Sequence, residues 1–68
     1  RPMRIDELRV GDRVELHPAT DTWMRGDRYA TVIGLSKSPR AGSRVTIDMD
    51  RSGRACSVRP EDILSTLD

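Results

Sequence analysis

Aromatic side chains are scarce in this chain: it has no phenylalanine, one tryptophan (Trp23) and one tyrosine (Tyr29). The interior must therefore be built from aliphatic side chains, methionine and alanine. Grooves that capture proline-rich peptides are lined by several aromatic rings, and cages for methylated lysine need them too. Two rings are too few for either, so both kinds of peptide-binding module are excluded.

Histidine and cysteine occur once each, as His17 and Cys56. One cysteine cannot form an internal disulfide, and one Cys with one His cannot supply the four ligands of a structural zinc site. No Gly-x-Ser-x-Gly motif is present to build a hydrolytic triad around the histidine. We therefore expect no enzymatic activity, no metal and no cofactor. His17 should lie at the surface end of a strand, and Cys56 should be a small core residue.

Long apolar runs are also missing. None approaches the roughly 20 residues that span a bilayer, and no apolar signal region precedes the polar sequence. Together with the unpaired cysteine, this favours a cytoplasmic protein without membrane partners. Arg1 and Pro2 stand before Met3, and we expect them to be a remnant ahead of the native start, with residues 3–68 forming one domain.

Net charge is small, at +1, but it is unevenly distributed. Residues 25–59 carry eight basic side chains against three acidic ones, whereas the first 24 residues and the last nine are net acidic. Such asymmetry can concentrate positive potential on one side of a small protein. Eleven of the twelve basic residues are arginine.

Alternating apolar and polar residues predict strands. Residues 45–49 and 56–58 alternate on either side of a turn at 50–53, which indicates a half-buried hairpin. Residues 13–17 alternate as well, so Val14 and Leu16 should face the core. Residues 28–35 are apolar or β-branched at successive positions, which is typical of a central strand covered on both faces.

Turn-forming residues separate these strands. Residues 18–27 and 36–42 are predicted to be loops, the second one mobile. A single helical turn is expected at residues 6–8, and Pro60 should end the fourth strand and begin a second turn before a fifth strand at 63–67.

The carboxylates have structural explanations. Two adjacent pairs lie where the helical turns begin and should cap them: Asp6-Glu7 and Glu61-Asp62. Asp48 and Asp50 lie on the outward face of the hairpin, where they should pair with Arg54 or Arg59.

The sequence thus predicts an all-β fold of five short strands closed into a small barrel, with a single helical turn before the last strand. This order of strands and turns along the chain resembles that of the SH3-like small barrel. Within that group, Gly11-Asp12-Arg13-Val14-Glu15-Leu16 and residues 26–34 resemble the KOW-type barrels of transcription and ribosomal proteins. The resemblance implies a binding role next to nucleic acid.

A second resemblance is to the plasmid-encoded type II dihydrofolate reductases, short SH3-like barrels with a Gly-Asp-Arg-Val opening, as at residues 11–14, and a loop tryptophan, as at Trp23. Activity in that family depends on a Val-Gln-Ile-Tyr segment in the fourth strand. The equivalent stretch here reads Cys56-Ser57-Val58-Arg59. The resemblance therefore implies the barrel and not the reductase activity.

The arginines and the two aromatic residues suggest a nucleic-acid surface, because arginines neutralise phosphates and aromatic rings stack on bases. The alternative for Trp23 is that its ring closes one end of the barrel. The candidate binding residues are Trp23, Arg25, Arg28, Tyr29, Lys37, Arg40, Arg44, Arg51 and Arg54.

A different class of function stays open. The near-neutral total charge and the adjacent Trp23 and Met24 also fit a protein-interaction module that docks through this loop or through an edge strand. The partner would then be a larger protein assembly or a second copy of the chain. Compact arginine-rich domains of this kind suggest a bacterial or phage accessory protein.

Overall fold

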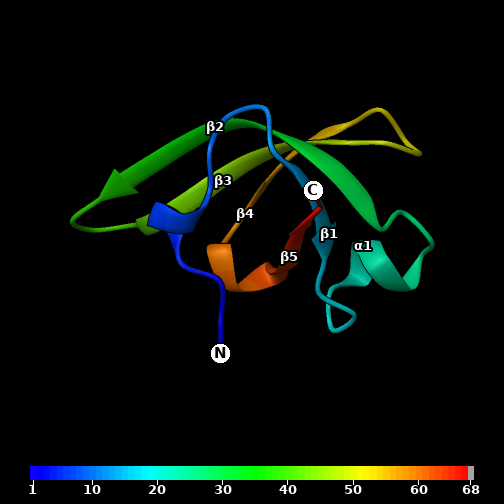
Figure 1. Cartoon of the computed structure of the whole chain (residues 1–68), viewed down its shortest axis with the longest axis horizontal. Coiled ribbons are helices and arrows are strands. Elements are labelled where there is room, and N and C mark those ends of the chain that lie inside the picture. The colour runs from blue at the N-terminus through cyan, green and yellow to red at the C-terminus, as the bar shows by residue number, and fades with distance from the viewer. Residues whose placement is uncertain (68) are drawn as a thin grey trace.

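The computed structural model describes residues 1–67, which form one antiparallel sheet of five strands (Figure 1). Their order across the sheet is β4-β3-β2-β1-β5. The strands are β1 (Arg13–Leu16), β2 (Tyr29–Ser38), β3 (Gly42–Met49), β4 (Ala55–Val58) and β5 (Ile63–Leu67). The all-β prediction is confirmed, as is the predicted hairpin, which is β3 and β4.

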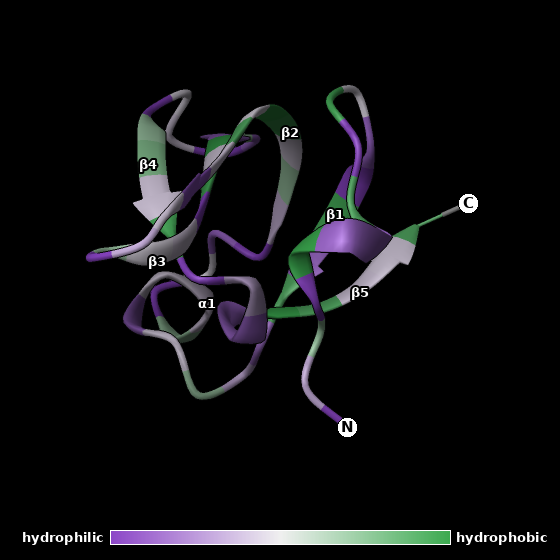
Figure 2. Cartoon of the chain, turned by 90° about the vertical axis from the view of Figure 1, so that its left-hand side faces the viewer, coloured by the Kyte–Doolittle hydropathy of each residue, from purple (hydrophilic) through white to green (hydrophobic). Residues whose placement is uncertain are grey.

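The core arises from the alternation along the strands. Val45, Ile47 and Met49 of β3 are buried, and Val14 and Leu16 of β1 meet them from the other side of the coiled sheet, as predicted. Figure 2 shows β1 and β5 on one side of the molecule and β2, β3 and β4 on the other. The buried hydrophobic residues of the described chain are Leu8, Val14, Leu16, Ala30, Val32, Val45, Ile47, Met49 and Ile63.

β2 differs from its prediction in two ways. It continues to Ser38, so the predicted loop at 36–42 is wrong and only residues 39–41 connect β2 to β3. It is also not covered on both faces, because Tyr29, Ile33 and Leu35 are exposed. Tyr29 and Ile33 face outward because they alternate with the buried Ala30 and Val32. The pairing register with β3 shifts between Val32 and Gly34.

The segment 18–27, predicted to be a loop, contains one helical turn, α1 (Asp21–Met24). Thr20 caps it: its side-chain oxygen accepts the Trp23 N–H at 3.3 Å. Thr is a favoured N-cap residue because its hydroxyl satisfies a free amide of the first turn. A helix of four residues is too short to show a 3.6-residue period, so the pattern of apolar residues could not reveal it.

The two short helical turns confirm the expected capping. In η1 (Ile5–Glu7) the Glu7 carboxylate accepts the Arg4 N–H at 2.9 Å. In η2 (Pro60–Asp62) the Asp62 carboxylate accepts the Arg59 N–H at 3.0 Å. The η2 turn leads directly into β5, which begins at Ile63.

The difference in burial between two isoleucines, one on β2 and one on β3, can be tested. Ile47 is fully buried and Ile33 is 47% exposed. Ile47→Ala should lower the free energy of unfolding by about 2–5 kcal/mol, whereas Ile33→Ala should change it by less than about 1 kcal/mol. Urea unfolding of the two variants measures both. Equal losses of unfolding free energy would contradict the outward position of Ile33.

Candidate nucleic-acid interface

Three of the predicted arginines line one surface pocket. Arg25 comes directly after the last residue of α1, and Arg51 and Arg54 lie on the turn between β3 and β4. The pocket has a volume of about 760 Å³ and lies between these two segments. We call it the arginine pocket; its other lining residues are Thr22, Asp27, Met49, Ser52, Ala55 and Cys56.

Asp27 fixes the turn that presents two of the arginines. Its buried carboxylate accepts the Arg51 N–H at 2.9 Å and the Ser52 N–H at 3.0 Å. Burial acts to raise the pKa of Asp27, but the hydrogen bonds from Ser52 and Arg51 and the charge of Arg51 outweigh it, so the pKa is lowered. Asp27 is therefore an anion committed to the protein's own main chain.

Gly26 allows Arg51 to lie across the end of α1. Its φ of +94° is in the region that favours glycine. A Cβ at this position would be 2.5 Å from Nη1 of Arg51. A side chain at residue 26 would thus be strained and would also displace the guanidinium from the pocket rim.

Asp50 is held from the opposite side by Arg13. The two form a bidentate ion pair in which Arg13 Nη1 donates to Asp50 Oδ1 at 2.6 Å, and the same nitrogen donates to Thr31 Oγ1 at 2.9 Å. This pairing lowers the pKa of Asp50. The predicted pairing of Asp50 with Arg54 or Arg59 is wrong, because the long side chain of Arg13 on β1 holds the Asp50 carboxylate instead.

The predicted pairing of Asp48 across the same hairpin is also absent. Asp48 is exposed, and no ion pair joins it to another described residue. Arg54 likewise has no carboxylate within salt-bridge distance in residues 1–67. The guanidinium groups of Arg25, Arg51 and Arg54 are therefore not neutralised by ion pairs within this part of the chain.

Trp23 combines features of both of its predicted roles. It is half-buried and packs against the core, and its Nε1 donates to the Glu15 carboxylate at 3.4 Å. The guanidinium carbon of Arg28 lies 3.9 Å from the ring centroid, and Arg28 Nε donates to the Trp23 carbonyl at 3.3 Å. One ring face is thus covered by a cation. Tyr29, the first residue of β2, is 44% exposed.

The remaining candidates lie at the other end of the molecule. Lys37 and Arg44 come from the paired ends of β2 and β3, and Arg40 lies in the turn that joins them. Arg44 is partly occupied, because its guanidinium donates to the hydroxyl and the carbonyl of Ser57, each at 3.1 Å. The nine candidates therefore form three groups, not one surface.

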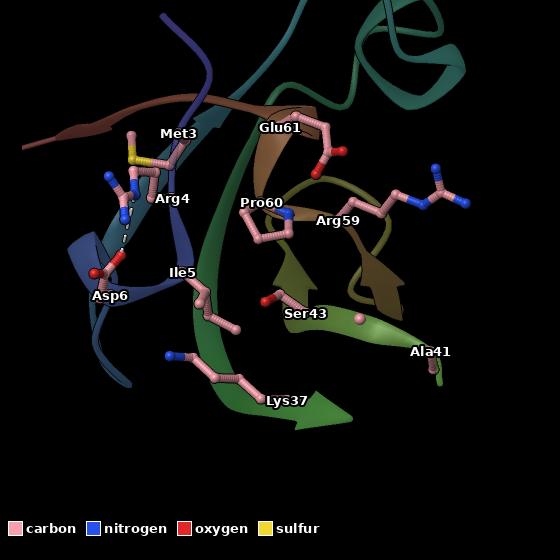
Figure 3. Close-up of a pocket in the computed structure, with 11 residues that line it drawn as sticks. Met3, Arg4, Ile5, Asp6, Lys37, Ala41, Ser43, Arg59, Pro60 and Glu61 are labelled. Carbon is pink, nitrogen blue, oxygen red and sulfur yellow. Dashed lines mark ion pairs between the residues drawn. The ribbon is translucent and has the colours of Figure 1, made fainter. Parts of the chain in front are cut away.

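A second hollow, of about 600 Å³, lies at that end between η1, η2 and the start of β3 (Figure 3). Lys37 contributes to it, with two basic residues that are not among the predicted binding residues, Arg4 and Arg59. Asp6 and Glu61 also line it, and Arg4 Nε is 3.7 Å from Asp6 Oδ1. We call this hollow the end groove.

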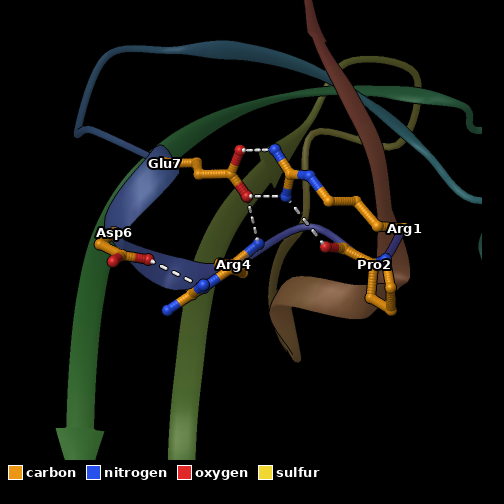
Figure 4. A network of polar contacts seen from close by, with 5 residues as sticks. All are labelled: Arg1, Pro2, Arg4, Asp6 and Glu7. Carbon is orange, nitrogen blue, oxygen red and sulfur yellow. Dashed lines mark hydrogen bonds and ion pairs between the residues drawn. The ribbon is translucent and has the colours of Figure 1, made fainter.

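The N-terminal segment is fixed beside the end groove by the network in Figure 4. Arg1 Nη1 donates to Glu7 Oε1 at 2.6 Å, and the same carboxylate caps η1. The hydrogen bonds from Arg1 and from the Arg4 main chain lower the pKa of Glu7 to about 2. Arg1 thus contacts the domain, although it stands ahead of Met3.

The lone histidine and the lone cysteine both have structural surroundings. His17 is exposed directly after β1, as predicted, and its Nδ1 accepts the Ala19 N–H at 3.0 Å. Cys56 is half-buried, packs against the core and also lines the arginine pocket. Within residues 1–67, no three His, Cys, Asp or Glu side chains are placed to hold a metal ion, and no helix is long and apolar enough to cross a membrane.

No known family model, curated protein or solved structure matches the chain. The resemblance to KOW-type barrels therefore stays a prediction, and the site must be interpreted from its own geometry.

The role of Asp27 can be tested by stability. Asp27→Ala leaves two main-chain N–H groups of the turn without their acceptor, which should cost about 1–3 kcal/mol of unfolding free energy at neutral pH. Because the folded-state pKa is lowered, the carboxylate stabilises the fold above its ordinary pKa of 3.8, and this stabilisation is lost as the pH falls further.

The free energies of unfolding of Asp27→Ala and of the unaltered protein should therefore become more similar below about pH 3.8. Urea unfolding at several pH values measures this. Asp48→Ala is the matched control, because Asp48 is an exposed aspartate of the same hairpin and should change stability by less than about 0.5 kcal/mol. A constant difference across the pH range would contradict the role given to the Asp27 carboxylate.

Proposed function

We propose that this domain is a non-enzymatic binding module that associates with nucleic acid through the arginine pocket. One observation carries the proposal: Arg25, Arg51 and Arg54, far apart in the sequence, line a single pocket without ion pairs to described carboxylates. The one acidic residue in the lining, Asp27, is already committed to the N–H groups of the turn.

Phosphate is the ligand group that suits this arrangement. Guanidinium groups bind phosphate oxygens through two parallel hydrogen bonds, and arginine keeps its charge at any physiological pH. Thr22 lines the same pocket, and its hydroxyl adds a neutral donor. The turn is held by Asp27 and by the Arg13–Asp50 pair, so two of the three cations extend from a fixed main chain.

Phosphate contacts should contribute more to binding than base stacking. Stacking needs an open aromatic face, and one face of Trp23 is covered by Arg28 at 3.9 Å. Arg28 is close to α1 in the chain. When a nucleic-acid strand binds, Arg28 can leave the Trp23 ring and bind a phosphate instead. We therefore expect binding that depends strongly on salt and weakly on base sequence.

Salt dependence tests the proposal directly. For a 20-nucleotide DNA, the logarithm of the binding constant should fall with the logarithm of salt concentration by about 0.7 per phosphate contacted on a single strand, or 0.9 on a duplex. The triple variant Arg25→Gln, Arg51→Gln, Arg54→Gln should make this slope shallower, by the amount expected for the loss of about three phosphate contacts.

The matched control removes three charges at the opposite end, by Lys37→Gln, Arg40→Gln and Arg59→Gln. It should change the slope little, because these residues lie outside the arginine pocket. Equal effects of the two triple variants would show non-specific attraction to total charge. A flat salt dependence, or no binding to DNA or RNA at low salt, would contradict the function.

Cys56 offers an independent measurement because its side chain lines the arginine pocket. A bound oligonucleotide should slow alkylation of this thiol, and the slowing should disappear in the triple arginine variant. Mass spectrometry after timed exposure to iodoacetamide measures the rate. Unchanged alkylation at saturating oligonucleotide would place the ligand elsewhere on the surface.

Docking onto a larger protein assembly is the second candidate function. The observation that favours it is the exposure of Met24, at 69%, next to the half-buried Trp23. Methionine and aromatic residues are enriched in the cores of interfaces. Met24→Ala should weaken capture of such a partner without changing the slope for DNA, which separates the two functions.

A further inference from the structure

Strand β4 has a neighbouring strand on one side only. It is the last strand at one end of the sheet order, next to β3, and Figure 2 shows it at the border of the molecule. Within the described chain, β3 is the only element that packs extensively against β4. The side of residues 55–58 that is turned away from β3 is therefore a free edge of the sheet, which we call the β4 edge.

The main-chain hydrogen bonds of the turn show the phase of the β3–β4 pairing. Met49 directs both of its main-chain groups toward β4, because its N–H donates to the Arg54 carbonyl and its carbonyl accepts the Gly53 N–H. Successive residues of an antiparallel strand alternate between the two sides. The register of β3 with β4 is continuous from Asp48 onward, so this alternation holds along the whole pair.

The alternation assigns the residues of β4 to its two sides. Ile47 is two residues from Met49 and so also faces β4, where it pairs with Cys56. Cys56 thus directs its main-chain groups toward β3. The residues on either side of it, Ala55 and Ser57, direct their N–H and C=O groups to the β4 edge.

Most of these edge groups have no partner in the protein. Within residues 1–67, no hydrogen bond joins the N–H or C=O of Ala55, or the N–H of Ser57, to a loop or a helical turn. The Ser57 carbonyl accepts Arg44 Nη2 at 3.1 Å. Both edge residues are exposed, and Ala55 lines the arginine pocket, so the protein leaves space beside it.

The apolar side chains next to the edge are only half covered. Cys56 and Val58 pack against the core but are half-buried, whereas their partners on β3, Ile47 and Val45, are fully buried. β3 lies between two strands, and β4 does not. A strand added at the β4 edge would place its inward side chains against Cys56 and Val58.

Arginines stand at both ends of β4. Arg54 precedes it and Arg59 follows it; both are exposed, and neither has an ion pair with a described carboxylate. Charged side chains commonly protect free edges from uncontrolled pairing. If two copies of β4 paired in opposite directions, Arg54 of one copy would approach Arg59 of the other. A segment with a carboxylate at each end would instead form two ion pairs.

We propose that the β4 edge binds an extended segment of a partner protein that is apolar on one face and acidic at both ends. An added strand is held by main-chain hydrogen bonds and selected by its side chains. Ala55 and Ser57 supply the hydrogen bonds, and antiparallel pairing is the more stable arrangement. Asp48 lies opposite Ala55, so the carboxylates belong at the ends of the segment and not beside Ala55.

This inference goes beyond the proposed nucleic-acid function, although Arg54 and Ala55 belong to both surfaces. The two proposals fail separately. Absence of DNA binding would overturn the nucleic-acid function alone, and absence of peptide binding would overturn the role of the β4 edge alone.

The free protein allows a first test of the edge. In hydrogen exchange measured by NMR, the amides of Ala55 and Ser57 should exchange far faster than the amide of Cys56, which lies between them and is paired with β3. Equal protection of the three amides would overturn the assignment of a free edge.

The binding test uses a blocked peptide, Glu-Val-Thr-Val-Thr-Val-Glu, which should slow exchange of the Ala55 and Ser57 amides. Arg54→Gln with Arg59→Gln should weaken its affinity about tenfold or more, equivalent to about 1.4 kcal/mol. Lys37→Gln with Arg40→Gln is the matched control, because it removes the same charge from the β2–β3 end and should leave the affinity unchanged. Equal effects of the two double variants would overturn the role of Arg54 and Arg59.

A proline variant tests the main-chain contact from the side of the protein. Ala55→Pro removes an N–H of the edge but none of the β3–β4 pairing, and edge strands accept proline at such positions. It should remain folded by circular dichroism and lose the peptide, whereas Ala55→Thr, which keeps the N–H, should bind it. Equal binding by the two variants would overturn the proposal.

Methylated peptides test the same contact in the unaltered protein, whatever the stability of the proline variant. Methylating the two threonine nitrogens should abolish binding, because these residues face Ala55 and Ser57. Methylating the central valine nitrogen should be tolerated, because alternate N–H groups of an added strand face away from β4. Equal binding of the two methylated peptides, or no binding of the unmodified peptide at about 1 mM, would overturn the proposal.

Discussion

The continuous alternation along β3 is the constraint on which the rest of this structure depends. Its eight residues send Val45, Ile47 and Met49 into the core and direct successive main-chain groups to β2 and to β4. The chain has no phenylalanine, so its core consists of aliphatic side chains and methionine, and three of the nine buried hydrophobic residues in the described chain come from this strand. The arginine pocket lies at one end of β3, beside Met49, and the end groove lies at the other end, beside Gly42.

The acidic residues explain how a protein of net charge +1 can present a strongly basic pocket. Asp27 is committed to main-chain N–H groups, and Asp50 is committed to Arg13. Each carboxylate thus stabilises the turn between β3 and β4, and the Asp27 anion, whose pKa the charge of Arg51 helps to lower, offsets only part of the charge of the three arginines. Burial of Asp27 is favourable only because its oxygens are hydrogen-bonded, and this requirement positions Arg51 beside Gly26. The hydrogen bonds of Asp27 therefore fix the main chain of the turn and, with it, the position of Arg51 in the pocket.

Local patterns predict the β3–β4 hairpin, the buried Val14 and Leu16 and the turn begun by Pro60, because each depends on neighbouring residues alone. They fail for β2, because an apolar, β-branched sequence does not show that only one face of the strand packs on the core: Ala30 and Val32 are buried, whereas Tyr29 and Ile33 are exposed. The sequence predicts the arginine pocket only in part. The charge pattern indicates Arg25, Arg51 and Arg54, but it does not separate them from Lys37, Arg40 and Arg44, because that separation depends on strand register. Asp27 gives no signal, since its partners are main-chain groups 24 and 25 residues away.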